Sequence, residues 1–401
     1  MNQSLFLHIV EKLEGFLGKL PGTIQKPILR ELTPLKELFL QQRPPRFVLV
    51  GSSRLPLQEI LPALFAFALP ETERGVLMEI FRWQNLNAVD HGTLAVLDAR
   101  GADDVALANI HEELKQQAAD IFLFLDDGDV AKAPRKREIE NLAVLLEWNK
   151  TVVPADAKVI GISFYNPKRN LVRDHDGKVP KPSERTSKIQ AAFAAKSILR
   201  EHLLQVIELP ATPDRTVSGK AEALLRNFMS VLGQHLPNQA RVEMIRVSRD
   251  REAQAEVAQT LVKSTTAVCA AIGAQPIPLA DLPILTTLQL VMVSGIMHLS
   301  GRERSMRAAT EFVGALGANV GVGMLLREGT RAILKFFPGW GNVVCGMVAG
   351  AGTYAIGRAA IVYFVEGVSL KDAKLTYLRS RKKSADSRLS NSQELEATRH
   401  K

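Results

Sequence analysis

The residues best placed for chemistry follow an apolar run, Arg46-Phe-Val-Leu-Val50, which ends in Gly51. Such a run predicts a buried strand. A glycine loop between a strand and a helix can bind phosphate, because backbone N–H groups converge at the helix N-terminus. Arg54 lies three residues beyond Gly51 and has a side chain long enough to reach a phosphate. Gly51 and Arg54 are therefore candidates for a nucleotide-phosphate site.

The loop after Gly51 departs from the phosphate-binding consensus, Gly-x4-Gly-Lys-Ser/Thr. In that register Pro56 replaces the second glycine, Leu57 replaces the lysine and Gln58 replaces the hydroxyl that binds magnesium. Proline has no backbone N–H and leucine has no charge to place on the β- and γ-phosphates. The loop is therefore predicted to lack the groups that bind and polarise a triphosphate.

A second candidate is Leu94-Ala-Val-Leu-Asp98-Ala-Arg-Gly101, a strand followed by Asp-x-x-Gly. GTPases use this form to hold magnesium through water and to sense the γ-phosphate. An aspartate and a glycine after a strand also make an ordinary turn, and the sequence leaves both interpretations open. Asp98 would be a magnesium ligand only in an active enzyme.

The motif that reads guanine, Asn-Lys-x-Asp, is expected after the strand at 157–164. The chain there continues Ser163-Phe-Tyr-Asn-Pro-Lys-Arg169, which contains no such motif. The prediction is a vestigial nucleotide site with no catalytic residue and no cofactor, made of Gly51, Arg54, Asp98 and Gly101.

The elements that would position these residues alternate between strand and helix. Alternation of this kind predicts a mostly parallel sheet covered by helices. We assign an α/β domain to 44–238 and an amphipathic helical leader to 1–43. The expected strands are 46–50, 75–82, 93–98, 120–126, 157–164 and 204–209, and the clearest helices are 104–118, 136–149 and 186–202.

Composition excludes several other classes of protein. With 46% hydrophobic residues among 401, the chain is too apolar to be disordered, and two cysteines cannot form a disulfide framework or a cysteine-only zinc site. The histidines lack zinc-enzyme spacing, which predicts no metal site. No basic sheet with interleaved aromatic residues is apparent, so no nucleic-acid partner is expected.

After residue 238 the sequence changes to a glycine-rich, all-α pattern, assigned to 239–368. Two long apolar segments lie within it. A bilayer crossing takes roughly 20 apolar residues, so 336–357 is long enough to span a membrane and 264–301 is long enough for a hairpin. Glycine pairs such as Gly346-x-x-x-Gly350 favour close helix packing in membranes and also in tight soluble bundles. Membrane lipid is the expected partner, and a buried soluble bundle remains the alternative.

The formal net charge is +9, and its distribution is uneven. Residues 371–401 contain nine Lys and Arg against four Asp and Glu, a surplus of 9 − 4 = 5. This basic tail, taken as 369–401, is predicted to be disordered. It also favours contact with an anionic membrane surface.

Several segments together resemble a known family. The stretches Gln275-Pro-Ile-Pro278, Pro338-Gly-Trp-Gly341 and Ala349-Gly-Ala-Gly-Thr353 resemble the YcjF-like domain of bacterial inner-membrane proteins. The preceding part, with Asp98-x-x-Gly101 and Ala119-Asp120, is similar to the Era/TrmE-type GTPase domain often fused in front of it. The resemblance implies a P-loop GTPase-like fold and a location at the cytoplasmic side of the bacterial inner membrane.

The resulting interpretation is a non-catalytic, GTPase-like protein that binds or regulates a partner. The partner expected from the resemblance is an active GTPase paralogue or a second copy of the chain. Two alternatives remain. One is a divergent GTPase that binds GTP and magnesium through Asp98, Arg54 and the loop backbone, and the other is a soluble, cytoplasmic helical scaffold.

Overall fold

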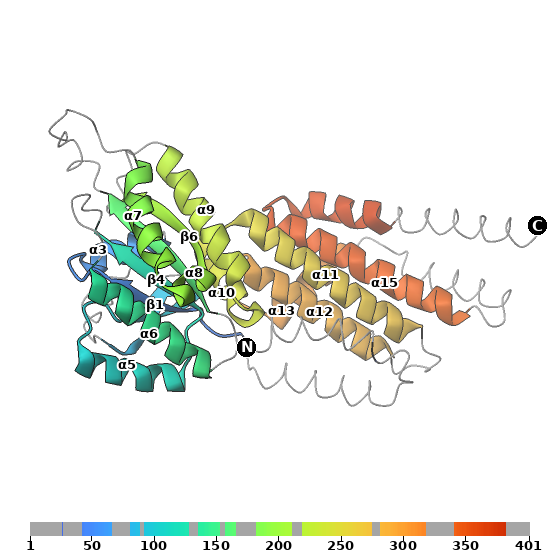
Figure 1. Cartoon of the computed structure of the whole chain (residues 1–401). Helices are drawn as coiled ribbons and strands as arrows, with labels where there is room; N and C mark the ends of the chain where they lie inside the picture. The colour runs from blue at the N-terminus through green and yellow to red at the C-terminus, as the bar shows by residue number, and fades with distance from the viewer. Residues whose placement is uncertain are drawn as a thin grey trace, which may run out of the picture. The chain divides into compact units, whose positions relative to one another are not determined.

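The computed structural model describes residue 26 and residues 42–65, 81–88, 92–127, 135–152, 157–165, 182–210, 219–274, 281–317 and 341–381. Its contacts divide the chain into two units, one of which is Arg43–Asp250 while the other contains Arg251–Lys401 (Figure 1). The division falls after Asp250 and not after residue 238, because α10 (Asn238–Ser248) packs on the core of the first unit. Of the leader at 1–43, nearly all lies outside the described residues.

The first unit is built on a six-stranded, mostly parallel sheet with the order β2-β3-β1-β4-β5-β6, which confirms the coarse fold expected from the sequence. Only β2 runs antiparallel to its neighbour, β3. Of the strand expected at 75–82, residues 75–80 lie outside the described part, Phe81 and Arg82 are not in a strand, and β2 begins at Trp83. The strands are β1 (Arg46–Gly51), β2 (Trp83–Ala88), β3 (Gly92–Asp98), β4 (Ile121–Asp126), β5 (Lys158–Tyr165) and β6 (Leu203–Pro210).

Helices cover both faces of this sheet, so its central strands are apolar on both sides. In β1, Phe47 and Leu49 face the core formed with α3, α9 and α10. Val48 and Val50 face the opposite core, formed with α5, α6, α7 and α8. The bounds are α3 (Leu57–Phe65), α5 (Asp104–Gln116), α6 (Lys136–Val152), α7 (Pro182–Ala194), α8 (Ser197–His202) and α9 (Gly219–His235).

One predicted helix is divided in the structure. The pattern at 186–202 indicated a continuous helix, but α7 and α8 are separated by Ala195 and Lys196. Phe193 on α7 and Leu199 on α8 are both fully buried in the same core. The break therefore turns two short helices so that each contributes an apolar residue to one face of the sheet.

The second unit is helical. It contains α11 (Arg251–Gly273), α12 (Asp281–Leu299), α13 (Met306–Gly317) and α15 (Gly341–Ala360), which continues into a π-helical turn, η1 (Ile361–Val365). Helix α10 of the first unit ends at Arg249, whose φ of 52° lies in the left-handed region, and α11 begins two residues later. Residues 370–381 form a further helix. That part of the tail is therefore ordered, contrary to the prediction, and 382–401 lie outside the described residues.

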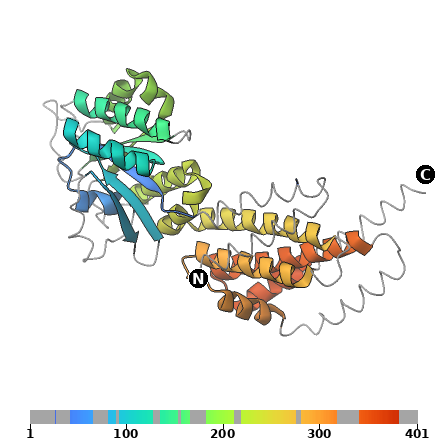
Figure 2. The ribbon, with the colours of Figure 1, turned by 90° about the horizontal axis from the view of Figure 1, so that it is seen from below.

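Helices α11 and α15 lie side by side and antiparallel (Figure 2). A Cβ placed on Gly346 would come within 2.6 Å of the Ala270 carbonyl oxygen, and one on Gly357 within 2.5 Å of Val262. Gly350 faces Ala270 in the same way. Glycine at these positions therefore permits the close approach that the Gly346-x-x-x-Gly350 pattern predicted.

Within the described residues, one helix is long and apolar enough to cross a membrane. Its window is Gly346–Val365, with a mean hydropathy of 1.4, and 61% of that window is buried inside the protein. The apolar stretch thus extends further towards the C-terminus than the expected segment 336–357. The other expected segment, 264–301, is divided between the end of α11 and the shorter apolar helix at Ile284–Leu299.

Candidate functional site

A crevice is expected at the carboxyl ends of β1 and β3. Helix α3, which follows β1, packs on one face of the sheet, while α5, which follows β3, packs on the other. In open α/β sheets ligands bind where successive connections leave on opposite faces in this way. Gly51 ends β1 and Asp98 ends β3, and the strands are paired with Leu49 opposite Asp98. The sequence-predicted residues therefore meet at the correct edge of the sheet.

Gly51 has a conformational role at this edge. Its φ is +105°, and a Cβ there would lie 2.3 Å from the Leu125 carbonyl oxygen. That same oxygen accepts a 2.8 Å hydrogen bond from the Ser52 N–H. The loop backbone thus turns tightly against β4, and one of its N–H groups is already bonded to protein.

Asp98 is bound by an arginine two residues further along the chain. Arg100 Nε donates to Asp98 Oδ1 at 2.7 Å and Arg100 Nη2 donates to Oδ2 at 2.9 Å. The Arg100 N–H also donates to Oδ1 at 3.2 Å. Both side chains are largely buried, with 5% exposure for Arg100 and 17% for Asp98. Two-pronged pairing of this kind is a strong, geometrically specific form of charge-assisted hydrogen bond.

The same guanidinium also holds the loop after β1. Arg100 Nη1 donates to the Leu55 carbonyl at 2.7 Å and to the Ser52 carbonyl at 3.4 Å. One arginine therefore joins the end of β3 to the loop in which a phosphate-binding motif would lie. The loop presents carbonyl oxygens to a protein cation at this point.

Arg54 points to a different acid. Its Nη1 lies 3.6 Å from Asp127 Oδ2, and 53% of its side chain is exposed. Ser52 Oγ donates to the same carboxylate oxygen at 3.3 Å. Arg54 therefore belongs to a loop contact beside β4, and it does not share a partner with Asp98.

The substituted loop positions have structural roles. The Pro56 carbonyl accepts from the Glu59 and Ile60 N–H groups, at 3.1 Å each, as α3 begins. Leu57 is partly buried against the core under α3. In place of a lysine directed at phosphates, the chain thus has an apolar side chain that anchors the first turn of the helix.

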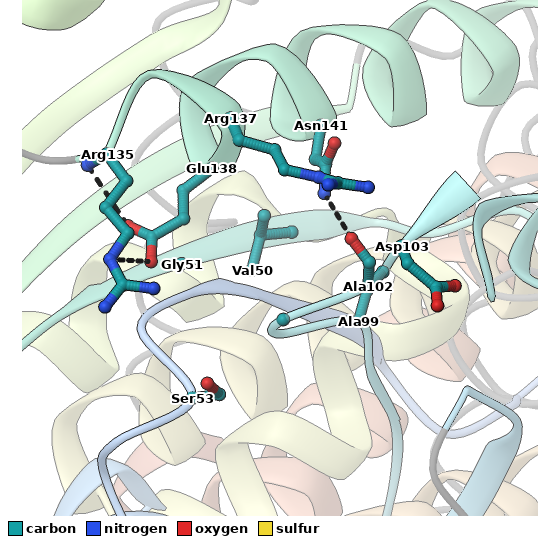
Figure 3. Close-up of a pocket in the computed structure, with 11 residues that line it drawn as sticks. Val50, Gly51, Ser53, Ala99, Ala102, Asp103, Arg135, Arg137, Glu138 and Asn141 are labelled. Atoms are coloured by element: carbon teal, nitrogen blue, oxygen red, sulfur yellow. Dashed lines mark hydrogen bonds and ion pairs between the residues drawn. The ribbon is translucent and has the colours of Figure 1, made fainter. Parts of the chain in front are cut away.

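A cavity of about 160 Å³ lies beside Gly51 and Gly101, between the loop, the β3–α5 turn and the start of α6 (Figure 3). Gly101 has a φ of +69°, and a Cβ there would lie 3.1 Å from Ser53 Cβ. The turn and the loop are therefore in close contact.

The charged side chains of this cavity all have protein partners, and Asp103 caps α5 by accepting from the Ala106 N–H at 2.8 Å. Arg135 Nε lies 4.0 Å from Glu138 Oε1, and Arg137 Nη2 lies 3.1 Å from Asp104 Oδ1. Burial raises the pKa of the Glu138 carboxyl, and a hydrogen bond from the Arg135 N–H partly offsets the rise. Asn141 Nδ2 donates to the Ala102 carbonyl at 3.0 Å. The polar side chains of this cavity therefore connect α6 to the start of α5 and to the turn before it.

A second arginine–aspartate pair lies at the opposite, amino edge of the sheet. Arg43 donates to both carboxylate oxygens of Asp120 at 2.7 and 2.6 Å, and the Arg46 N–H donates to Asp120 Oδ2 at 2.9 Å. Asp120 belongs to the Ala119-Asp120 pair that contributed to the family resemblance. In the structure, its bonds to Arg43 and Arg46 join the start of β1 to the start of β4.

The sequence motifs did not identify Arg100, the residue that connects Asp98 to the loop after β1. It occupies an unspecified position of the Asp-x-x-Gly pattern, so the motif gives no information on it. The available signal was an arginine two residues after an aspartate at a strand end, where a turn brings the two side chains together. Among the described residues no group of three or more His, Cys, Asp or Glu side chains is arranged to hold a metal.

No family model matches the chain. A curated relative, Magnetosome membrane protein 22 of Magnetospirillum gryphiswaldense, is 29% identical over 118 residues, which cover 28% of this chain. The chain spans about three fifths of that relative's length, 59%.

Two solved structures share a distant likeness. Toc33 from Arabidopsis thaliana aligns with a TM-score of 0.30 and 12% identity, over 59% of this chain and 96% of Toc33. A bacterial dynamin pair, described as a mechanism for long-range sensing and tethering of membranes, aligns with a TM-score of 0.28 and 10% identity. That alignment covers 98% of this chain and 74% of the dynamin chain.

Proposed function

We propose that this chain is a GTPase-like protein without nucleotide turnover, which acts by binding a partner at a membrane. The observation that carries the proposal is the two-pronged ion pair of Arg100 with Asp98, referred to below as a fork. Both carboxylate oxygens accept from the guanidinium, at 2.7 and 2.9 Å. The arginine brings to this carboxylate the positive charge that a bound magnesium ion brings in an active GTPase.

The residues present do not fit a magnesium–nucleotide complex. Asp98 faces Arg100, and Arg100 also satisfies the carbonyl oxygens of Ser52 and Leu55. Leu57 supplies no charge and packs on the core. A triphosphate placed at this edge would therefore meet carbonyl groups and an arginine already engaged, with no lysine to balance its charge.

We assign the unit Arg43–Asp250 to the P-loop GTPase-like class, and the helical unit to the YcjF-like class. Support for the first is the crevice at the carboxyl ends of β1 and β3, with a glycine loop on one strand and Asp-x-x-Gly on the next. Support for the second is the glycine-lined contact between α11 and α15, which includes Gly350 of the stretch 349–353 that contributed to the resemblance.

Nucleotide titration of the full-length protein tests the proposal. With GTP, GDP or ATP in magnesium, we expect dissociation constants no tighter than about millimolar, since a micromolar site needs about −8.2 kcal/mol. Arg100→Ala is expected to bind equally weakly, because Pro56 and Leu57 remain. Low-micromolar binding to the natural chain would reject the proposal and favour a divergent GTPase. Tight binding only in Arg100→Ala would identify the arginine as the sole barrier.

We further propose the cytoplasmic face of the bacterial inner membrane as the location, with membrane lipid and a GTPase-domain paralogue or second copy as partners. The apolar window at Gly346–Val365 and a partial relative named as a magnetosome membrane protein support membrane association. Fractionation followed by high-salt and carbonate washes tests it. Recovery of the natural chain in the soluble fraction before any wash would favour the soluble scaffold.

A further inference from the structure

The helix at 370–381 exposes two leucines on one side. Leu375 is 42% exposed and Leu378 is 46% exposed, and they are three positions apart, which places them on one face of the helix. Ala373 is fully buried and marks the side that packs on the rest of the unit. The helix therefore has apolar residues on its exposed side as well as on the side that packs on the unit.

Cations surround the two leucines. The helix carries four basic residues and one acid, Asp372. That acid is used at the helix start, where it accepts from Ser369 Oγ at 2.7 Å while its own N–H donates to the same hydroxyl at 3.2 Å. Arg381 lies over the ring of Tyr377, 6.0 Å from its centroid. The four basic residues are Lys371, Lys374, Arg379 and Arg381.

Resting on the proposed membrane association, we propose that this helix is a binding element for anionic lipid. A basic helix with exposed apolar residues lies in the interface of a bilayer, with its apolar side chains at the acyl boundary and its cations among the phosphates. Leu375 and Leu378 are the inserting residues, and Lys371 and Arg379, both exposed, flank them towards the headgroups.

The position of the helix agrees with this assignment. It begins five residues after Val365, the end of the apolar window that, within the described residues, is long enough to cross a membrane. Polybasic segments near such an apolar helix are attracted to the negative surface of the cytoplasmic leaflet. The surplus of positive charge also favours lipid phosphate over an uncharged apolar partner.

A fluorescence experiment on the full-length protein tests the proposal. An environment-sensitive label is attached at Leu378→Cys in a Cys345→Ala background, while Cys269 is fully buried and is left in place. The protein is mixed with or reconstituted into phosphatidylcholine vesicles, with or without about one third phosphatidylglycerol. We expect a blue shift and protection from iodide only with the anionic lipid. A label at Val105→Cys, a 74% exposed position in the other unit, serves as the control and should not respond.

A matched variant separates attraction from insertion. Replacing the four basic residues (Lys371→Gln, Lys374→Gln, Arg379→Gln, Arg381→Gln) should weaken the response to anionic vesicles by about 600-fold in lipid concentration, at about fivefold per cation. Leu375→Ser with the charges intact should keep salt-sensitive vesicle binding but reduce the blue shift. A response that is equal in both lipids, or unaffected by loss of the charges, would overturn the proposal.

The lipid test and the nucleotide test fail independently. Micromolar GTP binding with an intact lipid response would reject the non-catalytic function and leave the helix assignment standing. No lipid response from a protein that pellets with membranes would reject the helix assignment alone. Binding of this helix to an acidic protein surface would appear as that second outcome.

Discussion

Two arginine–aspartate forks lie at opposite edges of one sheet, and they do different work with the same chemistry. Arg43 and Asp120 are 77 residues apart and join the beginnings of β1 and β4. Arg100 and Asp98 are two residues apart and lie where β3 ends. The distant pair fixes tertiary structure, whereas the local pair occupies the edge at which α/β sheets bind ligands. Sequence separation, not bond geometry, distinguishes the two roles.

The largest expected effect comes from breaking the distant pair. Asp120→Ala removes the acceptor for Arg43 and for the Arg46 N–H, leaving two partly buried donors without this partner. We expect a loss of about 2 to 3 kcal/mol in the free energy of unfolding, measured by urea denaturation. Asp104→Ala is the control, since its carboxylate is 95% exposed. Equal effects of the two substitutions would show that the amino-edge fork is not a tertiary connection.

A smaller effect is expected from breaking the local pair. Arg100→Ala removes both side-chain donors to the Asp98 carboxylate and the donor to the Leu55 carbonyl, and we expect a loss of about 1 to 2 kcal/mol in the free energy of unfolding. Arg54→Ala is the matched control; its 3.6 Å contact and 53% exposure predict less than about 0.5 kcal/mol.

A double-mutant cycle sharpens the assignment. Because Arg100 and Asp98 share their hydrogen bonds, the losses from Arg100→Ala and Asp98→Ala should not add. Arg100→Lys should restore only part of the stability, since an ammonium group cannot form the fork. Additive losses would mean that the two residues stabilise the loop separately.

The smallest effect is a trend with pH at Glu138, a half-buried carboxylate at the carboxyl edge of the sheet. Burial raises its pKa in the folded chain, so the folded state favours the protonated form. Its contribution to stability is therefore greatest below the ordinary pKa and is lost as the pH rises through the folded-state value. Glu138→Gln should melt above the natural chain at pH 7, and the difference should shrink towards pH 4. A constant difference across that range would contradict this account.

The sequence predicted most of the sheet because the parallel strands are continuous apolar runs. It missed β2 because Trp83-Gln-Asn-Leu-Asn-Ala88 is an edge strand with polar alternation, which a search for apolar runs does not detect. The boundary at 238 was too early because the charges on α10 concealed its buried face, which includes Ala240 and Met244.

The candidate site was only partly predictable. Gly51, Asp98 and Gly101 were identified because strand ends and turn glycines carry a sequence signal. Arg100 was not, because its bonds to the Ser52 and Leu55 carbonyls depend on how a loop 45 residues away is folded. Arg54 was placed in the site from proximity in sequence, but its side chain faces Asp127.

The glycine-lined contact between α11 and α15 determines what a bilayer would encounter. Between Gly346 and Gly357, α15 runs beside α11 from Ala274 to Val262, and Lys263 lies exposed within that stretch. Entry of α15 alone into the hydrocarbon would separate the two helices and expose the glycine-lined contact to acyl chains. Entry of both helices would carry Lys263 into the hydrocarbon together with the apolar window. Placing a lysine near the middle of the bilayer costs about 2.5 to 3.5 kcal/mol. Attachment at the membrane surface is the arrangement that keeps α11 packed on α15 and Lys263 in water.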